Sequence, residues 1–189
     1  PTVYEPGLRE TYLRNKHNIE FTSGYKEIVT ECEIIVITVG TPWGSDNQPN
    51  ISGLQIVIDS ISPSLRKGHL IILRSTVTPG TTVRIGNELS KKSGLLPEKD
   101  FYLAFCPERT IEGIALHELY NLPNIIGGIG PISAAKTKTF FEKLGNQTIL
   151  VNSPTDAEVC KLVDNMYRAL NIGFANELGN LCEKIGIDS

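Results

Sequence analysis

The chain has 189 residues, of which 40% are hydrophobic and 21% are charged, with a formal net charge of −3 and a pI near 5.7. A chain of this length can bury a core, and its slightly acidic balance argues against a nucleic-acid-binding surface. The longest apolar runs are far too short to cross a bilayer, and the chain does not open with the charged and apolar regions of a signal peptide. We therefore expect a cytoplasmic protein that binds neither nucleic acid nor membrane.

The first 151 residues alternate short apolar runs with longer helical stretches. The apolar runs predict strands at 19–22, 33–39, 69–74, 102–105, 124–127 and 147–151. Helices are expected between them, at 7–16, 25–32, 51–65, 79–93 and 131–144. The strands are apolar on both faces, which is typical of parallel strands covered by helices on each side. This order predicts an α/β fold with a Rossmann-type, doubly wound parallel sheet.

The tail shows no strand pattern between residues 153 and 185. Ser153 and Asp156 flank a good helix start, and apolar residues then recur at helical spacing. We expect one long α-helical segment, with a possible bend near Asn171 or Gly173. The predicted domains are therefore residues 1–151, a Rossmann-like domain, and residues 152–189, the start of a helical domain.

A dinucleotide-binding fold normally opens with a strand and a G-x-G-x-x-G turn, and this chain has neither. Its dense glycine cluster, Gly127, Gly128 and Gly130, follows a late strand and predicts a strand-to-helix turn; a phosphate contact is the alternative. We therefore expect an incomplete sheet with an unpaired strand edge, which would favour self-association.

The four cysteines form no C-x-x-C pair, and the chain has only three histidines. We expect buried, reduced thiols and no disulfide or metal site. Cys106 lies next to an acidic segment, but no histidine is close in the sequence to activate it, so a packing role is expected.

Two polar turns follow neighbouring predicted strands, at the sheet edge where ligands bind in such folds. The first contains Val39, Gly40 and Thr41, and its small residues would let a cofactor approach the backbone. The second contains Ser75 and Thr76 before a helix start, a combination that favours an anion or a ribose. The alternative is an ordinary loop and plain helix capping.

Two pairs of chemically active residues are spaced four apart: Glu108 with Glu112, and Lys161 with Asn165. Where each stretch winds as a helix, this spacing puts both members on one face. Acid, base, cation and amide together suit the oxidation of an alcohol on a polar substrate. The alternatives are a solvated charged turn and a surface lysine.

Taken together, these segments resemble the nucleotide-sugar dehydrogenases, which oxidise UDP-glucose or UDP-N-acetylmannosamine to the uronic acid. The matching segments, in order, are EPGL, VGTP, STVTPGTT, PER-x-x-EG and AE-x-x-KL-x-x-N-x-x-RA. The form PERT is closer to the UDP-N-acetylmannosamine branch than the PEFL of the UDP-glucose branch. The nucleophilic cysteine of the family lies beyond the long helix, and none of the four cysteines here matches its motif. The chain therefore resembles an internal piece, and we expect no turnover by it alone.

The resemblance implies NAD as cofactor, no metal, and a UDP-sugar as substrate. Thr41 would position a water or contact the cofactor, and Glu112 would act with it as base or in hydrolysing an enzyme-bound ester. The residues implied to line NAD are Val39, Gly40, Thr41, Ser75 and Thr76.

On the substrate side, the resemblance places Glu108 and Arg109 in the same turn as Glu112. Lys161 would stabilise negative charge on the sugar oxygen, and Asn165 would hold that oxygen or the intermediate. The product would serve surface polysaccharide synthesis, and the long helix would support a homodimer. Three alternatives stay open: a UDP-glucose 6-dehydrogenase, a 6-phosphogluconate-like hydroxyacid dehydrogenase, and a non-catalytic dimerising module.

Overall fold

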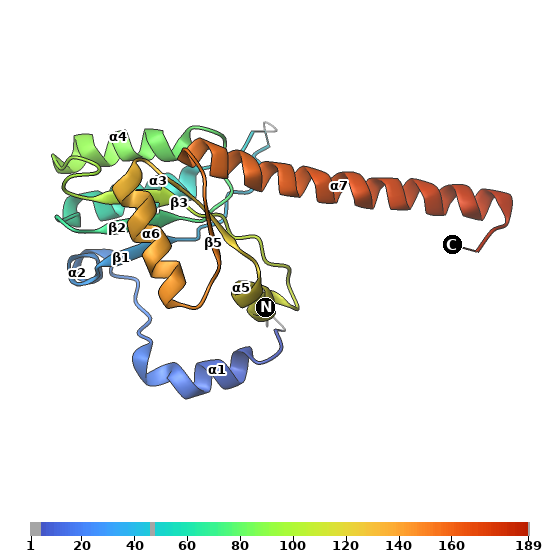
Figure 1. Cartoon of the computed structure of the whole chain (residues 1–189), viewed down its shortest axis with the longest axis horizontal. Helices are drawn as coiled ribbons and strands as arrows, with labels where there is room; N and C mark the ends of the chain where they lie inside the picture. The colour runs from blue at the N-terminus through green and yellow to red at the C-terminus, as the bar shows by residue number, and fades with distance from the viewer. Residues whose placement is uncertain (1–4, 46–47, 189) are drawn as a thin grey trace.

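The computed structural model describes residues 5–45 and 48–188 and places a five-stranded sheet between helices (Figure 1). The strands, which are hydrogen-bonded in chain order, are β1 (Ile34–Ile37), β2 (Leu70–Leu73), β3 (Tyr102–Phe105), β4 (Asn124–Gly128) and β5 (Thr148–Leu150). All neighbours are parallel except β3 and β4, which are antiparallel. The expected α/β, Rossmann-type architecture is confirmed, but the expectation that every strand runs parallel is wrong at β4.

A short helix that we did not expect lies between these two antiparallel strands. The chain leaves β3 through a loop and forms α5 (Ala115–Asn121), a helix of seven residues. β4 begins at the edge where β3 ends and runs the other way, with Phe105 beside Gly127.

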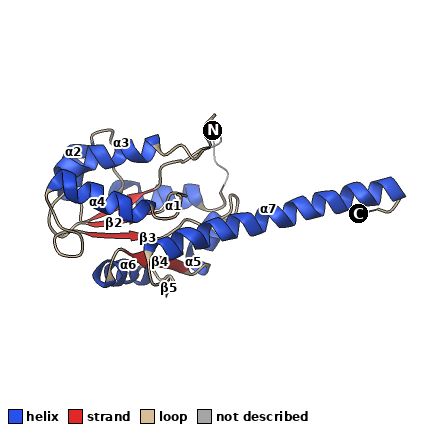
Figure 2. Cartoon of the chain, turned by 90° about the horizontal axis from the view of Figure 1, so that it is seen from above, coloured by secondary structure: helices blue, strands red, loops and turns tan. Residues whose placement is uncertain are grey.

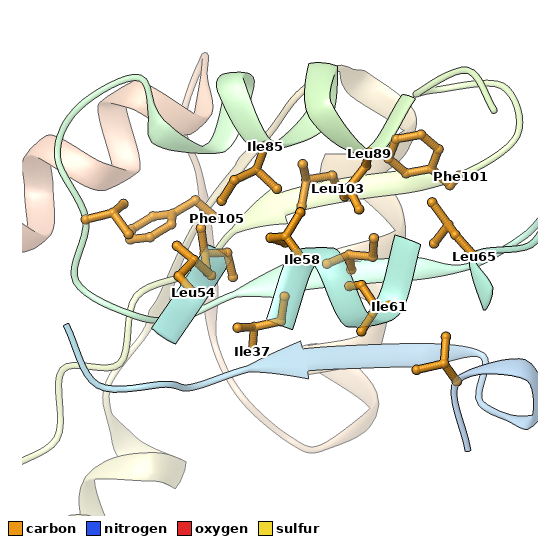
Figure 3. Close-up of a cluster of buried hydrophobic side chains, with 14 of the residues drawn as sticks. Ile37, Leu54, Ile58, Ile61, Leu65, Ile85, Leu89, Phe101, Leu103 and Phe105 are labelled. Atoms are coloured by element: carbon orange, nitrogen blue, oxygen red, sulfur yellow. The ribbon is translucent and has the colours of Figure 1, made fainter. Parts of the chain in front are cut away.

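Helices cover both faces of the sheet, so the doubly wound arrangement is confirmed. On one face lie α2 (Tyr25–Glu31), α3 (Ser52–Ile61) and α4 (Thr81–Ser93), and α6 (Pro131–Lys143) covers the other. The side chains of β2 alternate between the two faces of the sheet, and all of them are buried, as expected for a strand covered on both sides. Figure 3 shows the larger core on the first face, which includes Ile58, Ile85, Leu89, Leu103 and Phe105.

The strand expected at residues 19–22 does not form. These residues follow α1 (Leu8–Asn15) and the 3-10 turn η1 (Lys16–Asn18), and no described strand lies beside them to supply ladder hydrogen bonds. β1 pairs only with β2 in the described sheet, so its outer edge is unpaired, as the sequence predicted. Val36 on this strand is 42% exposed.

The tail forms α7 (Pro154–Ile185), a helix of 32 residues that projects from the body (Figures 1 and 2). Ser153 Oγ accepts the Asp156 amide at 3.2 Å, and Asp156 Oδ2 accepts the Ser153 amide at 3.0 Å. This capping box fixes the helix start. The helix runs unbroken through Asn171 and Gly173, and no described helix is long and apolar enough to span a membrane.

Three helices have no side-chain cap from their own N-cap residue and take one from a distant carboxylate. Glu5 accepts from the Gly113 and Leu116 amides at 3.0 Å before α5. Glu98 accepts from the first-turn amides of α6, and Glu158 does the same for α4. Distant segments thereby satisfy the amides that every helix start leaves without a partner.

His69 makes the stability of the fold sensitive to pH. It is fully buried at the start of β2, where Nδ1 accepts the Arg66 amide at 3.1 Å and Nε2 has no partner among the described residues. Burial lowers the pKa of His69, and the positive charge of Arg66 lowers it further. The unfolded chain therefore binds the proton more readily, and stability should fall as pH drops below about 6.5.

Urea unfolding between pH 8 and pH 5 should show this loss. The decrease in the free energy of unfolding from pH 8 to pH 5 should be smaller in His69→Gln than in wild type. His117→Gln, which replaces an exposed histidine, is the matched control. Equal decreases for wild type and His69→Gln would contradict the assignment.

Candidate functional site

The turns after β1 and β2 meet at one edge of the sheet. The two strands are parallel and in register, with Ile37 beside Leu73, so the residues that follow them stay close. The Thr41 hydroxyl donates to the Thr76 carbonyl at 2.6 Å. The two turns that the sequence singled out are therefore joined.

Both turns have features that a nucleotide could use. Ser75 is 6% exposed, and its hydroxyl has no hydrogen-bond partner among the described residues. A Cβ added at Gly40 would meet no atom within 4 Å, so the backbone there is open to approach. A buried hydroxyl without a partner beside accessible backbone fits a dinucleotide bound at this edge.

Arg74, the residue after β2, holds Glu108 in place. Arg74 is 8% exposed, and its Nη2 donates to Glu108 Oε2 at 2.7 Å. Its Nη1 reaches Asn124 Oδ1 at 3.4 Å, and its guanidinium lies 5.2 Å from the centre of the Phe141 ring. Glu108 Oε1 also accepts the Thr110 amide at 2.7 Å. Burial raises the pKa of Glu108, but the Thr110 amide and the Arg74 guanidinium outweigh it, so this pKa lies below its ordinary value.

The helix α7 brings Lys161 against the same turn. Lys161 is half-buried, and its Nζ donates to the backbone carbonyl of Glu108. Burial lowers the pKa of Lys161, while the nearby Glu108 carboxylate acts in the opposite direction. Arg109 adds a second link, because its guanidinium pairs with Asp164 Oδ2 on α7 at 3.2 Å and also donates to the Pro123 carbonyl.

The expected pairing of Glu108 with Glu112 on one helical face is wrong. Residues 106–114 form a loop, which ends in a turn where Gly113 has a φ of +94°. Pro107 and the bond from the Thr110 amide to Glu108 favour this local turn over a helix. Glu112 is exposed on that loop.

The other expected pair does form. Lys161 and Asn165 lie one turn apart in α7, as the spacing predicted. Lys161 faces the Glu108 turn, whereas Asn165 is exposed. The structure therefore brings Glu108, Arg109 and Lys161 together and leaves Glu112 and Asn165 at the surface.

Sequence reasoning missed two residues that organise this edge. Arg74 directly precedes the Ser75 turn, and its place at the end of a buried strand was a usable signal. Glu158 lies three residues before Lys161, but its partners are on α4, and no local pattern shows this.

Cys106 is a buried, packed thiol, as the sequence predicted. It is fully buried, its Sγ lies 3.5 Å from Asn124 Oδ1, and burial raises its pKa to about 12. Iodoacetamide should therefore label the partly exposed Cys32, Cys160 and Cys182 first, and label Cys106 only after denaturation, as read by peptide mass spectrometry. Early labelling of Cys106 in the folded protein would contradict this.

In the described part of the chain, no three His, Cys, Asp or Glu side chains gather to hold a metal.

Comparison with known proteins decides the family. Residues 1–145 match the NAD binding domain of the UDP-glucose/GDP-mannose dehydrogenase family, and residues 155–189 match its central domain. The chain belongs to this family. The expected resemblance and the expected cofactor, NAD, are thereby confirmed.

Several known proteins are similar to this chain. The NDP-N-acetyl-D-galactosaminuronic acid dehydrogenase of Ralstonia solanacearum is 34% identical over 177 residues, 88% of this chain and 42% of that protein. The UDP-N-acetyl-D-mannosamine dehydrogenase of Methanocaldococcus jannaschii is 37% identical over 161 residues, 84% of this chain and 36% of that protein. A solved UDP-D-ManNAc dehydrogenase from Pyrococcus horikoshii matches with a TM-score of 0.88 and 30% identity, covering 99% of this chain and 45% of that one. The chain thus spans less than half the length of these relatives.

Proposed function

We propose that this chain is part of an NAD-dependent UDP-sugar 6-dehydrogenase that oxidises UDP-N-acetyl-D-mannosamine to UDP-N-acetyl-D-mannosaminuronate, a surface polysaccharide precursor. The contact of Lys161 Nζ with the Glu108 carbonyl carries this proposal. It holds the ammonium group against the backbone of Glu108, whose carboxylate pairs with Arg74, at the same end of the sheet as the Thr41 and Thr76 turns.

In this proposal, NAD would supply the oxidising power when bound. Oxidation of the alcohol to the acid removes two hydrides in succession, so two molecules of NAD would be used, and water would provide the second oxygen of the acid. The chain would hold NAD with the two joined turns, through Val39, Gly40, Thr41, Ser75 and Thr76. The orphaned Ser75 hydroxyl and the open backbone at Gly40 support this placement.

The substrate side would use the groups around Glu108. The half-buried ammonium of Lys161 stabilises negative charge that develops on the sugar oxygen, and it acts strongly there because water is partly excluded. Glu108, paired with Arg74, and Arg109, paired with Asp164, give the turn a fixed shape. Glu112 and Asn165 would complete the site as base and hydrogen-bonding amide from its exposed side.

The sugar is the finer part of the proposal. The PERT form supports the UDP-N-acetyl-D-mannosamine branch, and the similar proteins from Methanocaldococcus jannaschii and Pyrococcus horikoshii both carry that name. A UDP-glucose 6-dehydrogenase is the alternative. Rates of NADH formation with UDP-N-acetylmannosamine and UDP-glucose, for the enzyme made from its complete reading frame, would separate them.

We also propose that the 189-residue chain has no turnover alone, that its domains are residues 1–151 and 152–189, and that it forms homodimers in the cytoplasm. Apolar side chains on the outer part of α7, such as Met166 (62% exposed) and Phe174 (71% exposed), support association. Four free cysteines suit a reducing compartment. NADH production by the chain alone, or a clean monomer in light scattering at high concentration, would contradict the corresponding part.

Calorimetric titration with NAD tests the cofactor site. The enzyme made from its complete reading frame should bind NAD, and its Gly40→Val variant should bind at least about tenfold more weakly, because its side chain occupies the open space beside the backbone. The matched control is Gly173→Val, since Gly173 also has no atom near its added Cβ but lies far along α7. Absence of NAD binding by wild type, or equal affinity in Gly40→Val, would overturn this assignment.

A further inference from the structure

We propose that Glu158 is a positioning residue that ties the predicted cofactor turn to Lys161, an inference that rests on the function proposed above. It joins two segments 76 and more residues apart in the sequence. Through it, the placement of Lys161 and the shape of the turn before α4 depend on each other.

The carboxylate of Glu158 is built into the start of α4. Glu158 is 1% exposed. Its Oε2 accepts a hydrogen bond from the Gly80 amide at 2.6 Å, and its Oε1 accepts one from the Thr82 amide at 2.7 Å. The Thr82 hydroxyl donates to the same Oε1 at 2.6 Å. Gly80 has a φ of +89° and no side chain with which to cap α4, so Glu158 supplies the cap.

The position of Glu158 on α7 determines where the side chain of Lys161 lies. Glu158 and Lys161 are three residues apart, so they lie on adjacent turns of one helical face. Of α7, only Pro154, Ala157 and Glu158 are buried. Glu158 is the polar member of this anchor, and its contacts set the rotation of the helix that points Lys161 at the Glu108 carbonyl.

The other end of the contact lies in the cofactor region. Gly80 and Thr82 follow the Ser75–Thr76 turn with only Val77, Thr78 and Pro79 between, and Thr78 and Thr81 hydroxyls lie 3.1 Å apart within this segment. A change at Glu158 should therefore reach both the turn and Lys161. Thermodynamic linkage makes the effect mutual, so a ligand on the turn should also alter the surroundings of Lys161.

The test compares variants of the full 189-residue chain. Glu158→Gln keeps the side-chain size, but its amide group can no longer accept from both backbone amides. Thr82→Val removes only the hydroxyl contact. Glu177→Gln, an exposed glutamate farther along α7, makes the same chemical change without a partner on α4 and serves as the matched control.

Two readouts are needed. The titration of Lys161 is followed by NMR with lysine labelled at Cε, and Lys161→Arg identifies the signal. The groups that act on its charge are Glu108, Asp164, Arg109 and Arg168. NAD affinity is measured by calorimetry in parallel, on the same variants of the enzyme made from its complete reading frame.

We expect Glu158→Gln to move the Lys161 titration toward that of an exposed lysine and to weaken NAD binding about tenfold. Thr82→Val should change the Lys161 titration and the NAD affinity in the same directions but by less. Glu177→Gln should change neither the Lys161 titration nor the NAD affinity. A folded Glu158→Gln whose Lys161 titration matches wild type would overturn the proposal; where Glu158→Gln does not fold, an unchanged titration in Thr82→Val would do so. Failure of the wild type to bind NAD would count against the proposed function, and the Lys161 titration would still decide the role of Glu158.

Discussion

Gly127→Ala should lower the free energy of unfolding by about 3 kcal/mol, because the start of α7 rests directly on this glycine. A Cβ at Gly127 would lie 2.6 Å from Pro154 Cα and closer still to the Ser153 carbonyl oxygen. Both are backbone atoms, so no side-chain rotation relieves the clash. The first turn of α7 must move away from β4, and Lys161 must move with it.

Urea unfolding of Gly127→Ala measures this cost, and Gly173→Ala is the control. Gly173 lies inside α7 with no atom near its added Cβ, so alanine there should leave stability unchanged or raise it by up to about 1 kcal/mol through helix propensity. Equal stabilities of Gly127→Ala and wild type would mean that α7 does not pack on β4 as described.

Arg74→Met should cost about 3 kcal/mol at neutral pH, because one buried guanidinium serves several groups at once. The variant leaves Glu108 without its 2.7 Å partner and Asn124 Oδ1 without its contact from Nη1. The methionine can still pack against Phe141, so the loss reports the polar contacts more than the volume.

The cost of Arg74→Met should also depend on pH. In wild type the pKa of Glu108 is lowered, so its contribution to stability is present above the ordinary carboxyl pKa of about 4.3 and is lost as pH falls through the folded-state pKa. Without Arg74, burial still raises the pKa of Glu108, so the carboxylate contributes less at neutral pH. The stability difference between wild type and Arg74→Met should therefore be larger at pH 7 than at pH 3.

Lys92→Met is the matched control for Arg74→Met. Lys92 also pairs with two carboxylates, Asp59 and Glu88, but at the surface, where water screens the charges. Its loss should be small. Equal effects of the two substitutions, or an Arg74→Met cost that does not change with pH, would contradict the role given to Arg74.

The sequence predicted most of the strands and helices because their patterns are local. The strand at Tyr102–Phe105 was placed with its observed ends, and the capped start of α7 was found from Ser153 and Asp156. The direction of β4 could not be predicted, because a buried strand has the same apolar pattern in either direction. The strand expected at 19–22 failed because strand formation needs a neighbour as well as a suitable sequence.

At the candidate site too, local patterns could be predicted from the sequence, whereas contacts between distant segments could not. The turns at Thr41 and Thr76 could be found because both follow buried strands, and the parallel register then brings them together. The i,i+4 rule was right for Lys161 and Asn165 and wrong for Glu108 and Glu112, where hydrogen bonds of the loop replace a helix. Glu5, Glu98 and Glu158 are contacts between distant segments, which no spacing rule reports.

The strand-to-helix turn expected at the glycine cluster is observed: Gly127 and Gly128 end β4, and Gly130 precedes α6. Close packing explains two of these glycines, because added Cβ atoms at Gly127 and Gly128 would strike the backbones that begin α7 and α6.

Because the body holds α7 only near its start, a small tilt there produces a large movement at its far end. Its 32 residues extend about 48 Å, yet only its first turns are held by the body. A tilt of about 10° at the anchor would swing the far end by about 8 Å. A partner that binds the outer half of this helix and tilts it would therefore also move the ammonium group of Lys161.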